Sequence, residues 1–488
     1  MRRHPFAAVN LISDPIHGYI ELTKRLEPGT AAGVDLPAEE SAEEDLLDTA
    51  WVQRLRRISQ LQSARWVFPT AEHSRFTHGL GVMHEAGLWA RHLYPSLRAA
   101  LSDAAPGIAL PSEGLVVETL RVAGLLHDVG HGPFAHFFDD HVLHDFPAPT
   151  DARRPGAKTL SHEDLGQLIV EHELGGIIGG LRRAPGVLPE RDAFAPGESI
   201  DPRWVAFLIS KPALTDPTMP RWVRWLQPLL SGVFTVDNLD YVRRDAYFTG
   251  VAVGPVDVER LRRYTFISES GLTLYEPGLG ALEMFLTARL FLYRQVYFHR
   301  TVRAIDLDLA EAFGPSIRAI FGDRSPAEAL SAYLDLDEYA LLHQAALWAR
   351  GEAIAAKPAV GDGRVSPAIA EAWRAILLRR PRWHADGEVR AEFEPGGFPD
   401  ALVATLGAAE PGRTAIDLAV VDARPAEATE TDSLLAVEGR DGRPAAPLSE
   451  SLARLPAYAL IARRYRRAQT SRPLDIAIPA STSAPPAS

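Results

Sequence analysis

The chain has 488 residues, of which 46% are hydrophobic, 23% charged and 8% aromatic. These fractions are ordinary for a folded globular protein and exclude a chain that is mainly disordered, collagen-like or fibrous. The formal net charge of −12 lacks the basic footprint that nonspecific duplex binding requires, so a nucleic-acid partner is not expected. Cysteine is absent, so any metal must be held by histidine and carboxylate side chains.

Membrane insertion and secretion are not expected either. No apolar run approaches the ~20 residues that a membrane-spanning helix needs. The basic start Met1–Pro5 is not followed by an apolar stretch, which argues against a signal peptide. We therefore expect a cytoplasmic location.

The first two-thirds of the chain are predicted to be mainly helical. Periodic apolar residues predict a helix over 48–61, and a largely apolar run predicts a buried helix over 115–127. Ser161 is typical of a helix N-cap and precedes an apolar helix over 165–170. One long helix is expected over 282–309. Loops rich in proline, glycine or charge are predicted at 27–44, 146–159 and 182–202.

The last third of the chain is richer in alanine, proline and glycine. Short strand-like pieces at 388–393 and 415–421 predict a smaller α+β accessory region. The tail over 471–488 is rich in Pro, Ser and Ala and is predicted to be disordered in part. The expected fold class is therefore mainly α, with a helical core over 1–345 and an accessory region over 346–470.

Histidines are crowded into one part of the chain. There are 16 in all, and 11 of them fall between His73 and His172. Histidine is the commonest metal ligand, and its side chain titrates nearest physiological pH. The crowding indicates a metal or proton-transfer site within this stretch.

The central motif is His127-Asp128, which ends the apolar helix and is followed by Gly130. Neighbouring residues on a helix point about 100° apart, but a turn at Gly130 can bring both side chains around one cation. Imidazole and carboxylate suit Zn, Fe or Mn, and a carboxylate-rich shell shifts the preference toward Mg. The alternative, a polar helix end at the surface, leaves His131 and His136 unexplained.

Two further segments carry side chains that could complete such a site. His78 follows Arg75 by about one helical turn. A second segment repeats carboxylate, phenol and guanidinium groups at helical spacing, at Asp237, Asp240, Tyr241, Arg244 and Asp245. Such a helix face is either solvated or lines a polar site.

Together His78, His127-Asp128 and Asp237 form the pattern H…HD…D, which resembles the metal-binding signature of HD-domain phosphohydrolases. Other segments resemble the branch of deoxynucleoside triphosphate triphosphohydrolases, which includes the sterile-alpha-motif and HD-domain protein of animals. These segments are 14–18 (DPIHG), 53–56 (QRLR), 67–69 (VFP) and 297–300 (YFHR). The resemblance spans roughly residues 9–310, implies a helical HD-domain core, and includes no sterile-alpha-motif domain.

The resemblance implies a role for each matching position. The metal ligands would be His78, His127, Asp128 and Asp237. The acid/base cluster would be His131, His136, His162 and Asp139. The substrate contacts would be Arg75 on the phosphates and, around the sugar and base, Gln60, Leu61, Tyr241, Asp245, Arg289, Tyr293 and Tyr297. Which histidine gives the proton stays open, and a buried structural role is the alternative for His136, His162 and Tyr293.

The activity implied by the resemblance is metal-dependent hydrolysis of deoxynucleoside triphosphates to deoxynucleoside and inorganic triphosphate. One divalent transition metal, Fe, Mn or Zn, would occupy the HD site, and Mg or Mn would accompany the substrate phosphates. A homo-oligomer, either dimer or tetramer, and a nucleotide effector are the implied partners.

Three features keep other functions open. Asn238 replaces a lysine that contacts phosphate in the animal protein, and Asn10 replaces a lysine of its regulatory nucleotide site. The basic run Arg463–Arg467 is compatible with an RNA contact or with a solvated helix face. The alternatives are a nucleotidase or single-strand nucleic-acid phosphodiesterase that uses the same site, and a nucleotide-sensing assembly module with little turnover.

Overall fold

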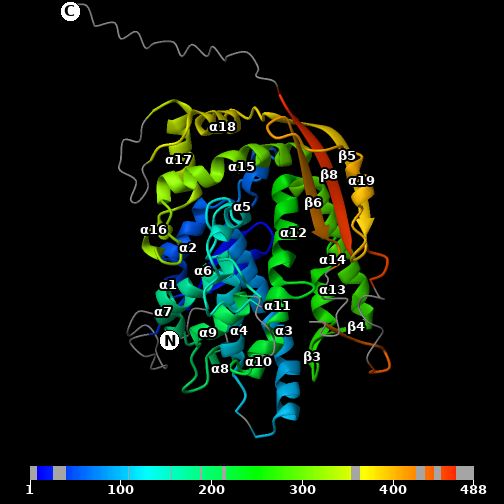
Figure 1. Ribbon diagram of the computed structural model, residues 1–488. Coiled ribbons are helices and arrows are strands. Elements are labelled where there is room, and N and C mark those ends of the chain that lie inside the picture. Colours follow the sequence, from blue (N-terminus) through cyan, green and yellow to red (C-terminus); the bar gives the residue numbers. More distant parts are fainter. Residues whose placement is uncertain are drawn as a thin grey trace, which may run out of the picture.

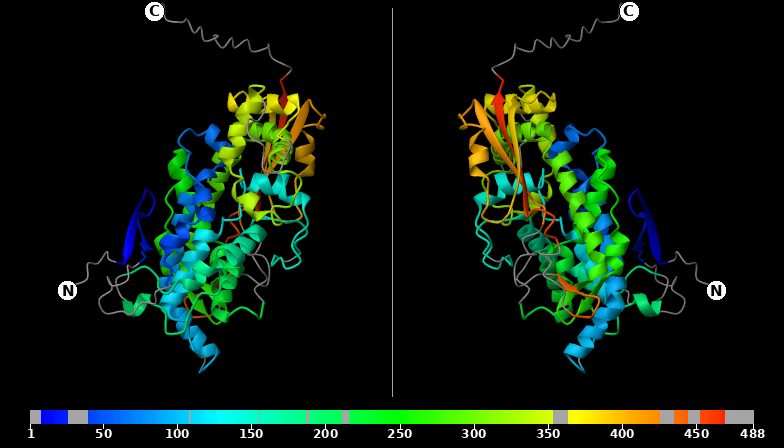
Figure 2. Two further views of the ribbon diagram at one scale, coloured as in Figure 1. Left: turned by 90° about the vertical axis from the view of Figure 1, so that its left-hand side faces the viewer. Right: turned by 90° about the vertical axis from the view of Figure 1, so that its right-hand side faces the viewer.

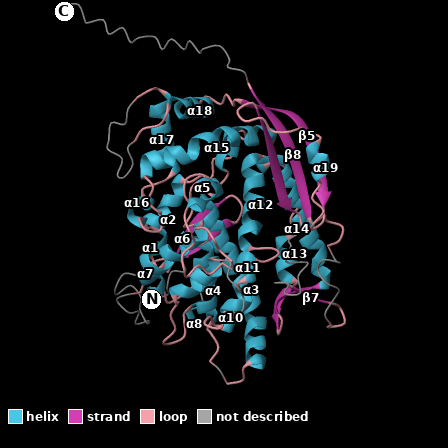
Figure 3. Ribbon diagram, in the orientation of Figure 1, coloured by secondary structure: helices cyan, strands magenta, loops and turns pink. Residues whose placement is uncertain are grey.

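The computed structural model describes residues 8–25, 40–107, 109–154, 156–186, 189–210, 216–352, 363–424, 435–443 and 452–468. Helices make up the body of the molecule, and the strands lie at its margins, as the views in Figure 2 and Figure 3 together show. The mainly α fold class predicted from the sequence, with a smaller α+β region, is confirmed.

Three helices form the centre of the core: α3 (Arg75–Ala104), α4 (Glu113–Leu126) and α12 (Val236–Thr249). Both α4 and α12 pack against α3. α4 begins where the Ser112 hydroxyl accepts the N–H of Leu115, and all but the first of its residues are buried. The buried helix predicted over 115–127 is therefore confirmed.

Shorter helices surround this core. In the first half of the chain they are α1 (Glu43–Leu47), α2 (Ala50–Arg54), α5 (His136–His141), α6 (His162–Leu168), α7 (Gly175–Gly180), α8 (Pro189–Asp192), α9 (Pro202–Ile209), α10 (Arg221–Leu226) and α11 (Pro228–Ser231). The predicted N-cap is confirmed, because the Ser161 hydroxyl accepts the N–H of Asp164 at the start of α6. Later helices are α13 (Val258–Arg263), α14 (Leu279–Leu292), α15 (Arg300–Phe321), α16 (Leu330–Leu334), α17 (Glu338–Ala349), α18 (Pro367–Leu377) and α19 (Asp400–Ala404).

The strands form three small sheets. An antiparallel hairpin of β1 (Val9–Asp14) and β2 (Gly18–Thr23) projects from the side of the helical body (Figure 2). A second sheet has the order β3-β4-β7 and joins β3 (Thr265–Ser268) and β4 (Gly271–Tyr275) to β7 (Ala436–Glu438).

The third sheet has the order β5-β8-β6 and is antiparallel. It consists of β5 (Trp383–Phe393), β6 (Thr414–Asp422) and β8 (Tyr458–Arg467). It lies at one end of the helical body (Figure 1), where β5 contacts α15. The strands predicted at 388–393 and 415–421 fall within β5 and β6 and are confirmed.

The helix predicted over 48–61 is too long. α2 ends at Arg54, a single 3-10 turn follows, and the backbone is extended at Ile58. Ser59 then donates its N–H to the Glu338 carboxylate at 3.1 Å. A tertiary contact that is distant in sequence therefore overrides the local helical periodicity.

The single helix predicted over 282–309 is instead two helices. α14 runs into the π-helical turn η6 (Tyr293–Tyr297), and α15 starts only at Arg300. Between them, the His299 ring accepts the N–H of Thr301 as an N-cap. Apolar periodicity continues through the break, so the sequence pattern did not reveal it.

The basic run Arg463–Arg467 is part of strand β8, so the predicted helix face is wrong. Arg463 is buried and donates to the Phe298 carbonyl and to Glu388, both at 2.6 Å. Arg464 and Arg466 both pair with Asp386, at 2.7 and 3.0 Å. Arginines with carboxylate partners on the same sheet do not form a free basic surface.

Some sequence-based expectations fall outside what the structure describes. Most of the predicted loop over 27–44, and all of the tail over 471–488, lie outside the described residues. The predicted loop over 182–202 contains the short helix α8. The domain boundaries at 345 and 470 stay a prediction. Within the described residues, no helix has the length and apolarity needed to cross a membrane.

Glu338, at the start of α17, is a fully buried carboxylate that joins two loops. Its Oε1 accepts the backbone N–H groups of Ser59 and Phe134, each at 3.1 Å, and its Oε2 lies 3.4 Å from Arg65 Nη1. Burial raises the pKa of Glu338 to about 7, although Arg65 and the two N–H groups oppose this shift. The folded protein therefore binds a proton here more tightly than the unfolded chain does.

We expect Glu338 to make the free energy of unfolding depend on pH. Its pKa is raised from 4.5 to about 7, so its stabilising contribution is complete below pH 4.5 and is lost as the pH rises through 7. The loss should approach roughly 3 kcal/mol. Urea titrations should therefore show Glu338→Gln gaining stability relative to the wild type between about pH 5 and about pH 8. A constant difference would contradict this assignment, and Glu371→Gln on the exposed side of α18 is the control.

Gly130 allows the turn after α4 to pack against the start of α6. A Cβ atom at this position would lie 2.0 Å from the His162 carbonyl oxygen and 2.5 Å from the Gly166 nitrogen. Both of these atoms belong to backbone and cannot rotate away. Only glycine therefore fits between the turn and α6.

We expect Gly130→Ala to lower the free energy of unfolding by about 2–4 kcal/mol, because the two segments must separate. The matched control is Gly176→Ala in α7, where an added Cβ would meet nothing within 4 Å. That variant should instead be more stable by up to about 1 kcal/mol, since alanine favours a helix over glycine. Chemical denaturation measures both, and equal effects would refute the close approach.

Candidate metal centre and adjoining pocket

The first turn of α3 supplies two buried side chains, Arg75 and His78. The N–H of Arg75 donates to the Ile58 carbonyl at 3.0 Å, which fixes where the helix begins. His78 lies one turn further along the same helix, as the sequence spacing predicts. Both side chains point toward the end of α4.

The end of α4 supplies His127 and Asp128. The His127 ring donates from Nδ1 to the Gly124 carbonyl at 2.8 Å, because a carbonyl oxygen can only accept. Its Nε2 is buried and makes no hydrogen bond to any described residue, and it lies 3.4 Å from Asp128 Oδ1 and 3.7 Å from Asp237 Oδ1. A buried imidazole nitrogen that faces two carboxylates is the environment of a metal ligand.

Asp237 completes the group from the first turn of α12. His78 Nε2 lies 3.0 Å from Asp237 Oδ1 and 4.0 Å from Asp128 Oδ2. Ligand atoms of His78, His127 and Asp128 all lie within 4.8 Å of one another. Metal–ligand bonds of ~2.0–2.2 Å place donor atoms roughly 3–4 Å apart, so these side chains fit one divalent cation.

The electrostatics of this group also favour a cation. Burial alone would lower the pKa of His78, but the Asp237 and Asp240 carboxylates raise it to about 10. Burial likewise opposes ionisation of Asp128, yet Arg75 and His127 hold the pKa of that carboxyl well below its usual range. The resulting negative potential at the imidazole holds a proton strongly, and a divalent metal can take that proton's place.

Asp240 fixes the orientation of His78 from behind. One Asp240 oxygen lies 2.8 Å from His78 Nδ1, and the other lies 2.6 Å from His17 Nε2. Arg244 donates to both oxygens, at 2.7 and 3.0 Å, and also to Asp14 at 2.8 Å. A carboxylate on Nδ1 leaves Nε2 to face a metal and sets the direction of the ring.

Arg75 lies beside the same group. It donates to Asp128 Oδ2, and its side chain lines the cavity described below. The family resemblance implies that Arg75 contacts the substrate phosphates. In this structure its guanidinium is paired with Asp128.

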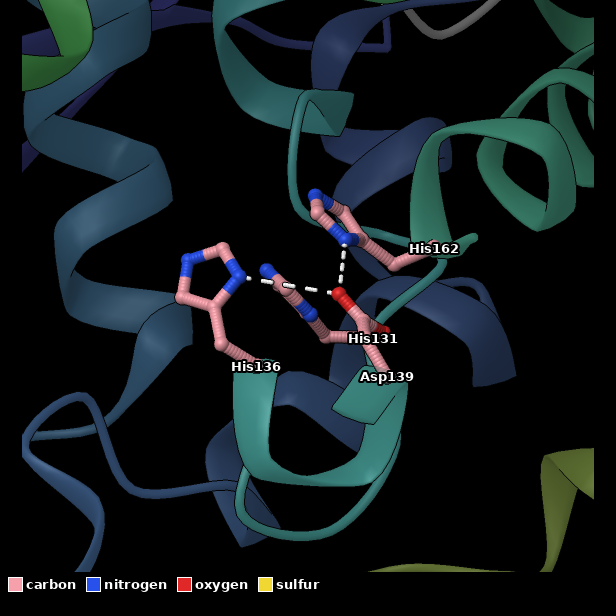
Figure 4. A group of neighbouring side chains, drawn as sticks. All are labelled: His131, His136, Asp139 and His162. Atoms are coloured by element: carbon pink, nitrogen blue, oxygen red, sulfur yellow. Dashed lines mark hydrogen bonds and ion pairs between the residues drawn. The ribbon is translucent and has the colours of Figure 1, made fainter. Parts of the chain in front are cut away.

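A second cluster follows directly along the chain and contains His131, His136, Asp139 and His162 (Figure 4). Asp139 Oδ2 lies 2.5 Å from His162 Nδ1 and 3.6 Å from His136 Nδ1. The His131 ring stacks on His162, with 3.7 Å between the ring centroids. The four predicted side chains therefore lie in one group.

The histidines of this second cluster differ in exposure. His131 is fully buried, and burial next to Arg75 and His162 lowers its pKa well below the usual range, so this imidazole is neutral. His136 has 63% of its side chain exposed and lines the cavity. Only an accessible histidine can exchange protons directly with a bound molecule.

One cavity of about 320 Å³ joins the two clusters to a wall of aromatic and polar side chains. It is lined by Arg75, His127, Asp128, His136, His162 and Asp237 on one side. The predicted substrate contacts that also line it are Gln60, Leu61, Tyr241, Asp245, Tyr293 and Tyr297. Arg289 lies behind this wall, where it donates to the Tyr241 hydroxyl at 3.1 Å.

The helix face predicted from Asp237 onward is divided between two environments. Asp237, Tyr241 and Asp245 line the cavity, whereas Asp240 and Arg244 turn toward α3. Gly81 of α3 gives them room, because a Cβ there would lie 2.1 Å from Asp240 Oδ1. Helical spacing predicted that these side chains lie close together on one face of the helix, but it did not predict which of them line the cavity and which face α3.

Asn238 has a structural role at the start of α12. Its side chain accepts the N–H of Thr235 at 2.7 Å, and the Thr235 hydroxyl accepts the N–H of Asn238 at 3.1 Å. This reciprocal capping explains why an uncharged side chain is accommodated here.

Sequence reasoning missed several residues of the site. His17 was noted only within the DPIHG segment, and its contact with Asp240 was not foreseen. His73 lies 2.8 Å from Asp245 Oδ1, and the crowding of histidines was its only signal. Ser63, Arg303 and Asp306 line the cavity without any local motif that indicates it.

We expect Asp240→Asn to lower the affinity for a divalent metal by roughly 10–100-fold, because His78 loses the carboxylate that orients it. Titration of metal-free protein with Mn²⁺ or Zn²⁺ measures this loss. Asp14→Asn is the matched control, since it also removes a partner of Arg244 but does not touch His78. Similar metal affinity in the two variants would contradict the role of Asp240, and melting curves separate loss of folding from loss of binding.

Comparisons with known proteins agree with this geometry. The HD domain family matches residues 75–193. The uncharacterized protein YwfO of Bacillus subtilis is 31% identical over 301 residues, which are 62% of this chain and 54% of that protein. Deoxynucleoside triphosphate triphosphohydrolase SAMHD1 of Homo sapiens is 28% identical over 314 residues, 62% of this chain and 44% of that protein. The chain thus spans about half the length of the curated relatives it matches.

Solved structures share the fold. A hypothetical protein from Aquifex aeolicus superposes with a TM-score of 0.62 at 24% identity, covering 94% of this chain and 96% of that one. A phosphohydrolase from Bacteroides thetaiotaomicron gives a TM-score of 0.60 at 19% identity, covering 94% of this chain and 100% of that one. The sequence matches and the His/Asp cluster support a metal-dependent phosphohydrolase. Residues 75–193 match the HD domain, and the chain as a whole is consistent with an HD phosphohydrolase of the deoxynucleoside triphosphate triphosphohydrolase branch.

Proposed function

We propose that this protein hydrolyses deoxynucleoside triphosphates to deoxynucleoside and inorganic triphosphate. The observation that carries the proposal is the single cavity that joins the candidate metal centre to a wall of tyrosines. A metal centre alone would suit many phosphate esters. A cavity that continues from that centre past Tyr241, Tyr293 and Tyr297 suits a phosphate ester that carries a sugar and an aromatic base.

The metal would be held by His78, His127, Asp128 and Asp237. Two imidazoles and two carboxylates suit one transition metal ion, Fe, Mn or Zn, and Mg or Mn would accompany the substrate phosphates. When bound, the ion would neutralise charge at a phosphate oxygen and would lower the pKa of bound water. Arg75 would move from Asp128 to the phosphates, which its planar, permanently charged guanidinium suits.

The bond that breaks would be the one between the α-phosphorus and the 5′-oxygen of the sugar. Water adds at the α-phosphorus, and the leaving 5′-oxygen needs a proton. His136 is the proposed donor, because it is exposed to the cavity and its Nδ1 faces Asp139, which leaves Nε2 for the substrate. His162 Nδ1 and Asp139 Oδ2 lie 2.5 Å apart, and this pair would hold the proton that is exchanged with His136.

The sugar and base would lie against the polar and aromatic wall. Tyr297 donates to Asp245 at 2.5 Å, and this pair presents a fixed hydroxyl and carboxylate to the sugar. Gln60 Oε1 is buried and makes no hydrogen bond within the part of the chain that the structure describes, so it offers an acceptor for a sugar hydroxyl. Leu61 would supply the apolar contact where a 2′-hydroxyl would otherwise lie.

The sequence relationship also supports a homo-oligomer, dimer or tetramer, and a nucleotide effector. The alternative functions are less well supported. The single-strand nucleic-acid phosphodiesterase rests on Asn238 in place of lysine and on the basic run Arg463–Arg467, whose arginines have partners in the fold. A sensing module with little turnover does not require the candidate metal centre and proton-transfer cluster to face the same cavity.

The test is release of inorganic triphosphate from each of the four deoxynucleoside triphosphates. Metal-free protein should be inactive, and addition of Mn, Fe, Zn or Mg should restore release. Asp128→Asn should lose at least about a hundredfold in kcat/KM, because the metal contributes several kcal/mol to the transition state. Asp140→Asn, which removes an exposed carboxylate of α5, should retain activity.

Failure to release triphosphate with any metal or nucleotide effector would refute the proposal. Release of mononucleotides from a single-stranded oligonucleotide, abolished by Asp128→Asn, would favour the phosphodiesterase instead. A rise in melting temperature with nucleotides that are not consumed would favour the sensing module.

A further inference from the structure

The cavity has a polar end that neither the metal centre nor the phosphates require. Ser63, Arg303 and Asp306 all line it. Ser63 donates to Asp306 Oδ1 at 2.5 Å, and Arg303 Nη1 lies 3.3 Å from Asp306 Oδ2. Ser63 comes from the segment before α3, and Arg303 and Asp306 come from α15. The tertiary fold, and not a single local turn, therefore brings these side chains together.

The β5-β8-β6 sheet, called the C-terminal sheet from here on, holds this end in place. Asp417 of β6 is buried and binds Arg303 through both carboxylate oxygens, with Nη2–Oδ1 at 2.5 Å and Nε–Oδ2 at 3.0 Å. Asp417 does not line the cavity itself, so it acts on a bound molecule only through Arg303. A bidentate pair of this kind fixes the plane of the guanidinium.

The same sheet holds the rest of the wall. Arg289 donates to the Asp422 carbonyl of β6 at 2.7 Å. From β8, Arg463 donates to the Phe298 carbonyl at 2.6 Å, and the Tyr465 hydroxyl donates to the Arg300 carbonyl at 2.9 Å. The stretch from the end of α14 to the start of α15 is therefore fastened to the C-terminal sheet at several points.

The charges at this end indicate what it can bind. Arg303 carries one positive charge, whereas Asp306 and Asp417 carry two negative charges when ionised, so this end does not attract a triphosphate. It does offer hydrogen-bond donors and acceptors side by side. The edge of a nucleobase presents donors and acceptors in the same way, whereas phosphate oxygens only accept.

We propose that Arg303 and Asp306 read the edge of the substrate nucleobase and that Asp417 of the C-terminal sheet is the residue that positions Arg303. This inference rests on the proposed function and assigns base discrimination to a region of the chain outside the HD domain match. Arg303 and Asp306 would touch the base. Asp417 would act only through Arg303.

The test compares Asp417→Asn with the wild type on all four deoxynucleoside triphosphates and on 1′,2′-dideoxyribose 5′-triphosphate, which has no base. In the variant, KM for the nucleotides should rise and the ratios of kcat/KM among the four bases should change by about tenfold. The turnover of the base-free triphosphate, and the content of bound metal, should stay at the wild-type level. If the pair of Asp417 with Arg303 were merely structural, its loss would leave the ratios of kcat/KM among the four bases unchanged. It would also affect the nucleotides and the base-free compound to the same extent.

Two further variants make the experiment decisive. Asp386→Asn is the matched control, because Asp386 pairs with Arg464 and Arg466 on the same sheet, away from the cavity. If Asp417→Asn does not fold, Ser63→Ala removes a donor to Asp306 with little change in shape and should alter the ratios in the same way.

Three outcomes would overturn the inference. Unchanged ratios of kcat/KM among the four bases in both Asp417→Asn and Ser63→Ala would overturn this inference and leave the proposed function intact. An equal loss of activity on the nucleotides and on the base-free compound would do the same. Absence of triphosphate release by the wild-type protein would instead refute the proposed function, and this inference with it.

Discussion

Asp240 is a fully buried carboxylate whose oxygens are shared by two histidines and one arginine. Burying a charge is costly unless it is paired and hydrogen-bonded, and here Arg244 supplies a permanent positive charge while His78 and His17 supply further bonds. The arrangement requires α3 and α12 to approach closely, which Gly81 permits. The direction of the His78 ring, and with it the geometry of the candidate metal centre, therefore depends on how these two helices pack.

The N-terminal hairpin contributes to the site without reaching the cavity. Asp14 ends β1, accepts the N–H groups of Ile16 and His17 at 2.9 and 3.0 Å, and so shapes the turn that presents His17 to Asp240. Asp14 also pairs with Arg244, which places the hairpin on the same buried network as α12. A segment that looks peripheral in the ribbon view is thereby joined to the candidate metal centre through one intervening carboxylate (Figure 2).

The sequence predicted those parts of the fold that local signals encode. Apolar periodicity and caps located α4 and α6, and the spacing of histidines and aspartates located the side chains that gather at the end of α4. Interactions between distant segments were not predictable in this way. The extended backbone at Ser59 depends on Glu338, and Arg303 meets a carboxylate 114 positions later in the chain. Neither pair leaves a periodic pattern, and the strand that contains Arg463 resembled a charged helix because its partners lie on other strands.

The two histidine groups are organised by carboxylates of different character. Asp240 is bound to Arg244, whose charge does not change at any physiological pH, so its partner His78 is held in one orientation. Asp139 is bound instead to imidazoles, at 2.5 Å from His162 and 3.6 Å from His136, and histidine is the side chain that most often acts as a proton shuttle. One carboxylate therefore gives a rigid environment suited to holding a cation, and the other organises a group of imidazoles suited to moving a proton. Because His127-Asp128 and His131 lie on the same turn after α4, the close packing of Gly130 on α6 sets the distance between these two environments.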